Sequence, residues 1–525
     1  MSGLLFRDAQ PARTESPNRA DVVCFIGFVG RRLTSPLPSR LKAWLHDQGW
    51  RVRGSVINDD DPLLNVPVPV DSFEAFDRLF TWETRPSQPH AFPFTTWLGA
   101  AVRSFFRQGG ARCFVVRVGD PAPYALLAED ATDAEKAAHL VTQTERRGLL
   151  FPGFGGSALA PASRQNPTTW KGLGVLLGLD EAAFVCLPDV PELFADAALE
   201  PAGLAPLPPA PEVFVDCSPT VKLEPDGIRQ ISATPACTEA GLVTWRRAVR
   251  QAAQFIRAER RDVQLLLALP LLARTVRGRP TQLLDDPANA FGLGKSLDEP
   301  DGIATAFLQL CYPWLMTPGA EALPGGAEPA DGVFAGALAR AIPERGVAHS
   351  IGRRALPGIH GFEPELSTAD RVLDTAKGDS PALIHRVSLI GQTADGVRVL
   401  SDVTTSLAES HRPACIGRLT AALLRTARRI GEASTFEPSG GELAVSIRSQ
   451  LDRLLSDFFA AGALQGESAA EAYSIRCDET TTSQNDRDNG RVIAEVRFFP
   501  AHPVGLIVVV LSVREGAVSA LDVLT

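Results

Sequence analysis

Short apolar runs alternate with amphipathic stretches along most of the chain. The apolar runs predict buried strands, at 21–29, 113–118, 182–188 and 263–269. Apolar residues at helical spacing predict helices, at 38–50, 95–108, 170–179 and 245–256, and one more after a cap at Asp71 or Ser72. Helices that alternate with wholly apolar strands favour a parallel sheet covered by helices on both faces. The pattern therefore predicts an α/β fold.

A second block with a different pattern begins near Thr368. Two apolar stripes at helical spacing predict helices at 415–430 and 442–461. Strands follow at 473–477 and 491–499, on either side of a polar loop. This order predicts an α+β unit.

The apolar run GLIVVVLSV closes the pattern at 505–513. It carries β-branched residues on both faces of a strand, so such a strand needs cover on both sides. We expect 473–477 and 491–499 to form a local hairpin, and part of 505–525 to leave it and pair with another copy of the chain. The residues predicted to join subunits are Gly505, Leu506, Ile507, Val508, Val509, Val510 and Leu511.

Length and charge limit the class of protein. A chain of 525 residues predicts about three or four domains, and a hydrophobic fraction of 45% is ample for buried cores. The formal net charge of -9 argues against a nucleic-acid partner. For the same reason, the five arginines between Arg412 and Arg429 are interpreted as a solvated or subunit-facing helix side rather than as a polyanion surface.

Targeting signals are missing from the pattern. The start of the chain has no apolar segment of the secretory type, and no run reaches about 18 apolar residues, so we expect no membrane span and assembly in the cytoplasm. The eight cysteines are dispersed without a CxxC pair. We interpret most of them as small buried hydrophobic residues.

The segment Gly292-Leu293-Gly294-Lys295-Ser296 ends like a phosphate-binding P-loop. However, Asn289 stands where the first glycine belongs, and the preceding residues make a poor strand. A plain glycine turn before a helix near Pro300 is the preferred interpretation, so no cofactor is expected.

The segment Gly155-Gly156-Ser157 is faintly similar to the serine turn of subtilases. A serine nucleophile needs a histidine base and a carboxylate that orients it, and no histidine motif precedes Ser157 as it does in subtilases. The eight histidines also lack metal-binding spacings such as HxxxH. The sequence therefore predicts neither a catalytic nor a metal site.

Five blocks resemble one known family, the sheath proteins of contractile phage tails and related contractile injection systems. They are DVVCFIGFVGRR with PVPVDSFEAFDRLF, FFRQGGARCFVVRVGD, GLGVLLGLDEAAFVCLPDV, CYPWL with DGVFAGALARAIPERGV, and the closing stretch from FFAAGALQGES to VGLIVVVL. Each block alone is a weak signal, but together they stand in the family's order from 21 to 513.

The resemblance implies an α/β fold with a non-catalytic, subtilisin-like parallel α/β middle domain, an α+β sheath C-terminal domain and terminal arms. The implied divisions are an N-terminal arm at 1–20, an N-terminal α/β segment at 21–120, the middle domain at 121–367, the C-terminal domain at 368–504 and a C-terminal strand or arm at 505–525.

The resemblance also implies a structural function. Subunits polymerise into a helical contractile sheath around an inner tube protein, exchange strands through their arms, contact baseplate and cap proteins, and eject the tube when the lattice contracts. Two alternatives stay open: a baseplate or cap component that does not polymerise, and an α/β hydrolase or nucleotide-binding enzyme.

Overall fold

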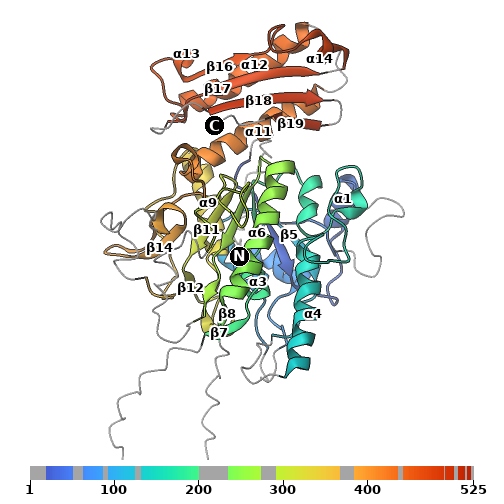
Figure 1. Cartoon of the computed structure of the whole chain (residues 1–525), viewed down its shortest axis with the longest axis vertical. Helices are drawn as coiled ribbons and strands as arrows, with labels where there is room; N and C mark the ends of the chain where they lie inside the picture. The colour runs from blue at the N-terminus through green and yellow to red at the C-terminus, as the bar shows by residue number, and fades with distance from the viewer. Residues whose placement is uncertain are drawn as a thin grey trace, which may run out of the picture.

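The computed structural model describes eleven stretches of the chain: 19–50, 63–86, 93–124, 132–199, 234–273, 291–366, 383–434, 441–489, 491–501, 507–514 and 517–521. These residues form a larger body, which holds the central sheet, and a smaller body above it, which holds a second sheet (Figure 1).

Eight strands form the central sheet, in the order β15-β14-β11-β9-β6-β1-β5-β3. The strands from β14 to β5 run parallel, while β15 and β3 pair antiparallel at the two edges. Their bounds are β1 (Val23–Phe28), β3 (Val68–Val70), β5 (Cys113–Gly119), β6 (Phe184–Cys186), β9 (Gln264–Ala268), β11 (Leu308–Tyr312), β14 (Ser388–Thr393) and β15 (Gly396–Val399). The four strands predicted from apolar runs are confirmed as β1, β5, β6 and β9, and the parallel sheet is confirmed at its centre.

Both faces of this sheet are buried. Along β1, Val23 and Phe25 belong to one hydrophobic cluster, and Cys24 and Ile26 belong to the cluster on the other side. Successive side chains of a strand point to opposite faces, so a strand without polar positions has to be covered twice. This is the physical reason for a helix layer on each face.

Helices supply the two layers. On one face, α3 (Trp97–Arg107) and α9 (Asp331–Arg345) pack on each other and on the sheet; on the other face, α6 (Glu239–Glu259) and the end of α4 (Asp133–Leu150) join the second cluster. The predicted helices at 95–108 and 245–256 are confirmed as α3 and α6. Seven of the eight cysteines are described, and all seven are buried and free, as predicted; Cys217 lies outside the described residues.

Two glycines bring α3 and α9 together. A Cβ atom at Gly332 would lie 2.6 Å from the Cα of Ala101, and one at Gly336 would lie 2.5 Å from the carbonyl oxygen of Phe105. Such distances are too short for any side chain, so glycine at these positions of α9 allows the two helix backbones to touch.

Smaller elements complete the larger body. Its other described α-helices are α1 (Ser39–Asp47), α2 (Phe73–Leu79) and α5 (Val190–Leu193), and its other described strands are β2 (Gly30–Arg31), β4 (Phe80–Thr81), β7 (Ala197–Leu199), β8 (Thr234–Cys237), β10 (Leu271–Leu272), β12 (Trp314–Met316) and β13 (Gly361–Glu363). The predicted helix at 38–50 is confirmed as the shorter α1. The predicted cap of α2 is confirmed as Ser72, whose Oγ accepts from the N–H of Ala75 at 3.2 Å.

Two predicted helices are wrong. The stretch 170–179 forms a 3-10 helix at Gly172–Gly178 instead of an α-helix, and the φ of 52° at Gly172 excludes an α-helix that runs through this residue. A Cβ at Gly172 would also lie 2.4 Å from the carbonyl oxygen of Leu149. No helix begins near Pro300, because the described chain turns there and continues to β11.

The central sheet crosses the boundaries predicted at 120 and 367. Strands β1 and β5 lie before the first boundary, β6, β9 and β11 between the two, and β14 and β15 after the second. Pairing between strands far apart in sequence leaves no local pattern, so periodicity alone could not reveal it.

The upper body has its own sheet and core. Its sheet has the order β16-β17-β18-β19, with β16 (Tyr473–Arg476), β17 (Val492–Phe498), β18 (Ile507–Arg514) and β19 (Ala517–Leu521). Its helices are α11 (Ala414–Ala433), α12 (Gly441–Ala460), α13 (Ala469–Ala472) and α14 (Gln484–Asp488). The two long predicted helices are confirmed as α11 and α12, and Gly462 ends the second one with a φ of 71°.

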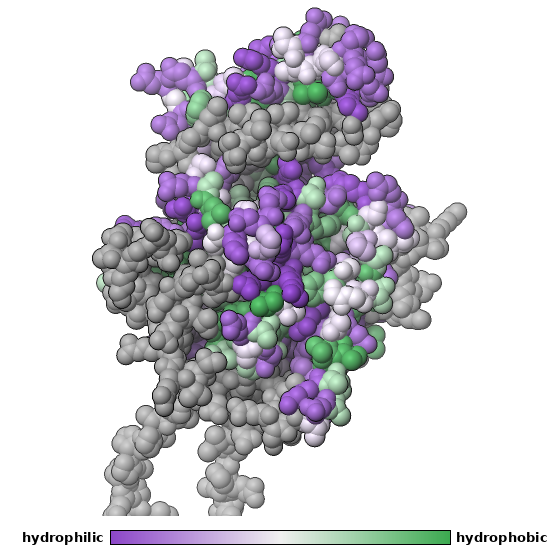
Figure 2. Space-filling model, viewed as in Figure 1, coloured by the Kyte–Doolittle hydropathy of each residue, from purple (hydrophilic) through white to green (hydrophobic). Residues whose placement is uncertain are grey.

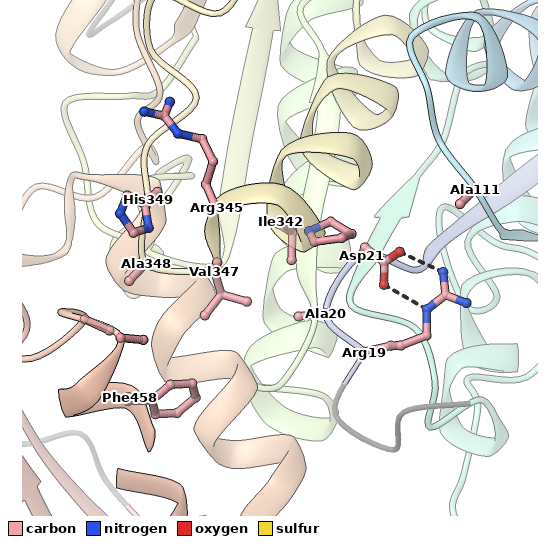
Figure 3. Close-up of a pocket in the computed structure, with 14 residues that line it drawn as sticks. Arg19, Ala20, Asp21, Ala111, Ile342, Arg345, Val347, Ala348, His349 and Phe458 are labelled. Carbon is pink, nitrogen blue, oxygen red and sulfur yellow. Dashed lines mark hydrogen bonds and ion pairs between the residues drawn. The ribbon is translucent and has the colours of Figure 1, made fainter. Parts of the chain in front are cut away.

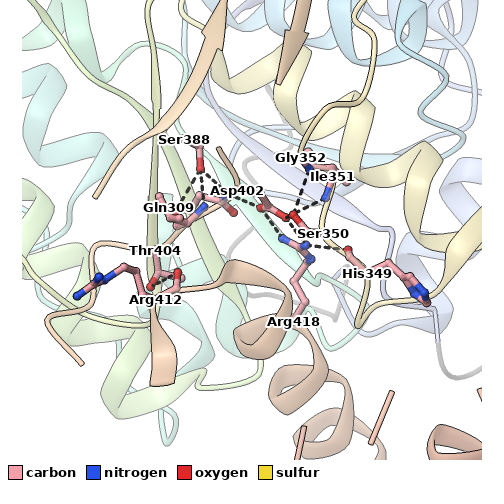
Figure 4. A network of polar contacts seen from close by, with 11 residues as sticks. Gln309, His349, Ser350, Ile351, Gly352, Ser388, Asp402, Thr404, Arg412 and Arg418 are labelled. Atoms are coloured by element: carbon pink, nitrogen blue, oxygen red, sulfur yellow. Dashed lines mark hydrogen bonds and ion pairs between the residues drawn. The ribbon is translucent and has the colours of Figure 1, made fainter. Parts of the chain in front are cut away.

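A buried ion pair fixes α11 to the larger body (Figure 4). Arg418 of α11 contacts Asp402 at 2.7 Å and also donates to the carbonyl oxygen of His349 at 3.1 Å. Asp402 further accepts from the N–H of Ile351 and from the amide of Gln309. Burial favours the neutral acid, but Arg418 and these donors outweigh it and hold the pKa of Asp402 below its ordinary value.

The interpretation of the arginines near α11 is therefore wrong for two of them. Arg418 and Arg425 are buried within the chain rather than solvated or subunit-facing. Arg425 donates to the backbone carbonyl oxygen of Asp262, which also pairs with Arg260. These arginines attach the first helix of the upper body to the central sheet.

Removal of the Arg418 charge tests this attachment. In Arg418→Met, Asp402 loses its cation while it stays buried, so we expect a loss of about 3–5 kcal/mol in the free energy of unfolding, measured by urea denaturation. The control is Arg340→Met, which breaks a half-exposed pair with Glu344 and should cost about 0.5 kcal/mol or less. Equal losses in the two variants would contradict the role of the buried pair.

Candidate assembly surfaces

One face of the upper sheet packs on helices. Ala494, Val496 and Phe498 alternate along β17, and all three are buried in a cluster with residues of α11 and α12. The residues between them, Glu495 and Arg497, lie on the other face and pair with each other at 2.6 Å. The sheet thus has a helix-covered face and an outer face.

Two apolar positions belong to the outer face. In the register of β17 with β18, Arg497 lies opposite Val508, and Glu495 lies opposite Val510. Residues directly opposite each other in an antiparallel pair share a face of the sheet. By this register, Val508 and Val510 belong to the same face of the sheet as Arg497 and Glu495.

The predicted hairpin is confirmed. β16 and β17 pair antiparallel from Tyr473↔Phe498 to Arg476↔Glu495. Of the predicted assembly residues, Ile507 to Leu511 lie on β18 and pair with β17 of the same chain, while Gly505 and Leu506 lie outside the described residues. Exchange of this strand with another copy stays a prediction. Within the described chain, the sheet edges are β16 and β19.

A groove of about 520 Å³ lies where the two bodies meet (Figure 3). One side is formed by Arg19 and Asp21, which pair at 2.7 Å just before β1. The end of α9 and the loop after it contribute apolar residues, among them Val347, and Phe458 of α12 lies opposite. The described chain therefore begins beside the junction; residues 1–18 of the predicted arm lie outside the described residues.

In the view of Figure 2, hydrophilic and hydrophobic residues are mixed over the described part of the surface. Hydrophobic residues form small separate patches there, between hydrophilic residues over α6 and over the upper body. Among the described helices, none combines the length and hydropathy that crossing a membrane requires.

Ser157 is engaged in local structure. Its hydroxyl donates to the carbonyl oxygen of Gly148 at 3.3 Å and accepts from the N–H of Leu159 at 3.1 Å. His139, on α4, has its ring beside the amide of Gln143 at 3.4 Å. The serine thus ties a loop to the end of α4, and both of these hydrogen bonds are to backbone groups.

The segment with Lys295 and Ser296 also uses its backbone internally. The N–H of Ser296 donates to the carboxylate of Glu299, and the N–H of Leu297 donates to the carbonyl oxygen of Ala304. A P-loop needs such N–H groups to point at phosphate oxygens. Here they close a turn instead.

Three acids near α3 and α9 are fully buried: Asp189, Glu328 and Asp331. Burial raises the pKa of each to about 7. Glu328 accepts hydrogen bonds from the hydroxyls of Ser104 and Thr317, at 2.6 and 2.5 Å. Strongly shifted acids mark candidate active sites only when they face a cavity. These three do not line the groove of Figure 3, and among the described residues no group of three or more His, Cys, Asp or Glu could hold a metal ion.

Comparison with protein-family models gives no match, and comparison with curated proteins gives none. Solved structures do match. A chain in the cryo-EM structure of the anti-feeding prophage baseplate in the contracted state has a TM-score of 0.53 and 17% identity, over 96% of this chain and 95% of that chain. A chain in the structure of the anti-feeding prophage helical sheath in the contracted state has a TM-score of 0.50 and 17% identity, over 96% of both chains.

These likenesses include both bodies of the molecule. The chain has the fold found in contractile tail sheath structures, and the resemblance that its sequence motifs carry is confirmed at the level of the fold. At 17% identity, the likeness establishes the fold and does not establish the function.

The buried acids predict an unusual dependence of stability on pH. Because the pKa of Glu328 rises from 4.5 to about 7 on folding, the folded chain holds a proton that the unfolded chain has lost. The free energy of unfolding should therefore be highest below pH 4.5, as far as Glu328 is concerned, and fall as the pH rises through 7. We expect Glu328→Gln to flatten this fall and to gain about 2–3 kcal/mol at pH 8.

The measurement is urea denaturation from pH 5 to 8. Glu442→Gln, at an exposed position of α12, is the matched control and should leave the pH profile unchanged. A wild-type profile that rises from pH 5 to 8 and is unaltered in Glu328→Gln would contradict the raised pKa.

Proposed function

We propose that this protein is a structural subunit that polymerises into a helical contractile sheath around an inner tube. The observation that carries the proposal is the likeness to a chain of the anti-feeding prophage helical sheath over 96% of both chains. In this proposal, the chain has a subtilisin-like middle domain and terminal arms that exchange strands with neighbouring subunits.

The outer face of the upper sheet is the proposed contact between subunits. Val508 and Val510 stand there beside Glu495 and Arg497, and the strands β16 and β19 form the sheet edges. Added strands bind through main-chain hydrogen bonds, which depend little on side chains. A neighbour that covers this face, with Gly505 to Leu511 as the joining segment, keeps subunits linked while the lattice changes its pitch.

Contraction needs no nucleotide in this proposal. An extended lattice relaxes to one that buries more surface between subunits, and this difference in free energy drives ejection of the tube. The remaining proposed partners are the inner tube protein and the baseplate and cap proteins. Assembly takes place in the cytoplasm, and the product is a phage tail or a tail-like particle.

A second candidate is a baseplate or cap component that does not polymerise. The observation that favours it is that other matched chains come from baseplate structures of the anti-feeding prophage. Negative-stain microscopy of the purified protein separates the two candidates, because the first gives long tubes and the second only small oligomers. An enzyme is disfavoured by the local bonds of Ser157 and of the turn at Ser296.

A charge exchange on β18 tests the assembly face. In Val508→Glu with Val510→Lys, each new charge lies opposite a residue of opposite sign, Arg497 and Glu495, so the sheet of the monomer gains cross-strand pairs. The apolar positions offered to a neighbour are lost. We expect a folded monomer with unchanged circular dichroism and no tubes by microscopy, and the same loss of tubes after deletion of 505–525.

Val445→Lys is the control, since it places a charge on an apolar side chain of α12 that is 68% exposed. Tubes should form normally in this variant. Normal tubes from the double variant on β18 would contradict the proposed contact, whereas absence of tubes from the wild-type protein would favour the non-polymerising component.

A further inference from the structure

The groove of Figure 3 lies over a seam between two hydrophobic cores. Val347, in the loop after α9, and Phe458, of α12, are only partly buried, and each packs against the core of the larger body and against the core of the upper body. Ala20 and Ile342 continue the apolar lining of the groove toward the start of β1 (Figure 3). Apolar side chains that cover this seam would remove it from water, and that burial is favourable.

The described chain begins at the edge of this groove. Arg19, its first residue, lines the groove and donates through Nε and Nη2 to the two carboxylate oxygens of Asp21, at 2.9 and 2.7 Å. The Arg19 side chain is 22% exposed, and a two-point pair of this kind fixes the direction of the residue that carries it. The segment 1–18 is therefore attached at the groove itself.

This segment contains one apolar run, Leu4-Leu5-Phe6. The residues between the run and Arg19, at 7–18, are charged or polar residues, prolines and alanines. Fully extended, they reach at most about 40 Å, and the run has to return only to a groove that Arg19 borders. The chain thus carries a short apolar run on a tether that starts beside an apolar groove.

The tether determines which occupant of the groove is favoured. A segment joined to its site by a short flexible linker has an effective concentration of about 1 mM. The same segment of a second copy is present only at the concentration of the protein, which is about a thousandfold lower in a micromolar solution. In dilute solution, the segment of the same chain therefore occupies the groove in preference to that of another copy.

We propose that Leu4, Leu5 and Phe6 dock into the groove of their own chain and cover the seam between its two cores. The docked segment crosses the junction of the two bodies and contacts both. The proposal does not rest on the proposed sheath function, because the groove and the segment belong to one chain.

A disulfide trap in the full-length protein locates the segment. In Leu5→Cys with Val347→Cys, mild oxidation of the monomer fraction should join the two positions within one chain, as detected by nonreducing electrophoresis and intact-mass measurement. The seven described native cysteines are buried, and the oxidised wild-type protein is the blank.

Ala12→Cys with Val347→Cys is the matched control, because residue 12 is closer to Arg19 along the tether. Without docking, the shorter tether gives position 12 the higher effective concentration, so it would link to position 347 at least as fast as position 5 does. Docking reverses this order, and we expect position 5 to link about tenfold faster or more. Equal or faster linkage at position 12 overturns the proposal.

Dilution separates the two possible sources of the segment. The yield of the bond within one chain should not change when the protein is diluted about tenfold, because both partners belong to the same molecule. A linked dimer whose yield falls on dilution overturns the proposal and assigns the groove to the segment of a second copy.

Proteolysis gives a second readout without added cysteines. Arg7 follows the docked run directly, so trypsin should cleave after it only when the run has left the groove. Leu4→Ser with Leu5→Ser should speed this cleavage about tenfold or more, once each rate is divided by that of the isolated peptide 1–18 of the same sequence. Cleavage after Arg13, within the tether, should proceed equally in both proteins. Equal normalised rates after Arg7 overturn the proposal.

Discussion

The buried pair of Asp402 and Arg418 holds the two bodies of the molecule together. Each charge alone would be costly in this position, because neither reaches water, and each is neutralised by the other. Arg418 belongs to the first helix of the upper body, whereas Asp402 is tied by hydrogen bonds to β11 and to the loop after α9. Helix α11 cannot leave the central sheet without separating these charges, so its direction is fixed relative to the sheet.

A fixed α11 determines where the upper sheet presents its outer face. The helix shares one core with α12 and β17, so the sheet follows the helix, and the helix follows the central sheet. The positions of Val508 and Val510 are thereby set by a contact that lies in a different part of the chain. For the proposed sheath function this matters, because a contact face contributes to a regular assembly only when every copy holds it in the same direction.

The sequence could predict the strands and helices that depend on local periodicity, such as β1, β9 and α12. It failed at 170–179, where the left-handed conformation of Gly172 overrides an apolar pattern, and it could not show which strands pair across hundreds of residues. The burial of Arg418 and Arg425 could not be predicted in the same way, because a charged side chain normally indicates an exposed position. The spacing contained one signal. Arg418 and Arg425 are seven residues apart, and alanines lie three or four residues from each, so small side chains leave room for a second element on that side of the helix.

The arrangement of the upper sheet is unusual for a chain that acts alone. Open sheet edges and apolar outer positions invite other strands, and proteins that stay monomeric protect them with charges, prolines or covering helices. Among the described residues, the helices pack on one face only, while β16 and β19 stay at the edges and valines occupy the other face. Within the described chain, the final apolar run gains backbone hydrogen-bond partners from both β17 and β19. Under the proposed function, a neighbouring subunit covers the outer face of this sheet.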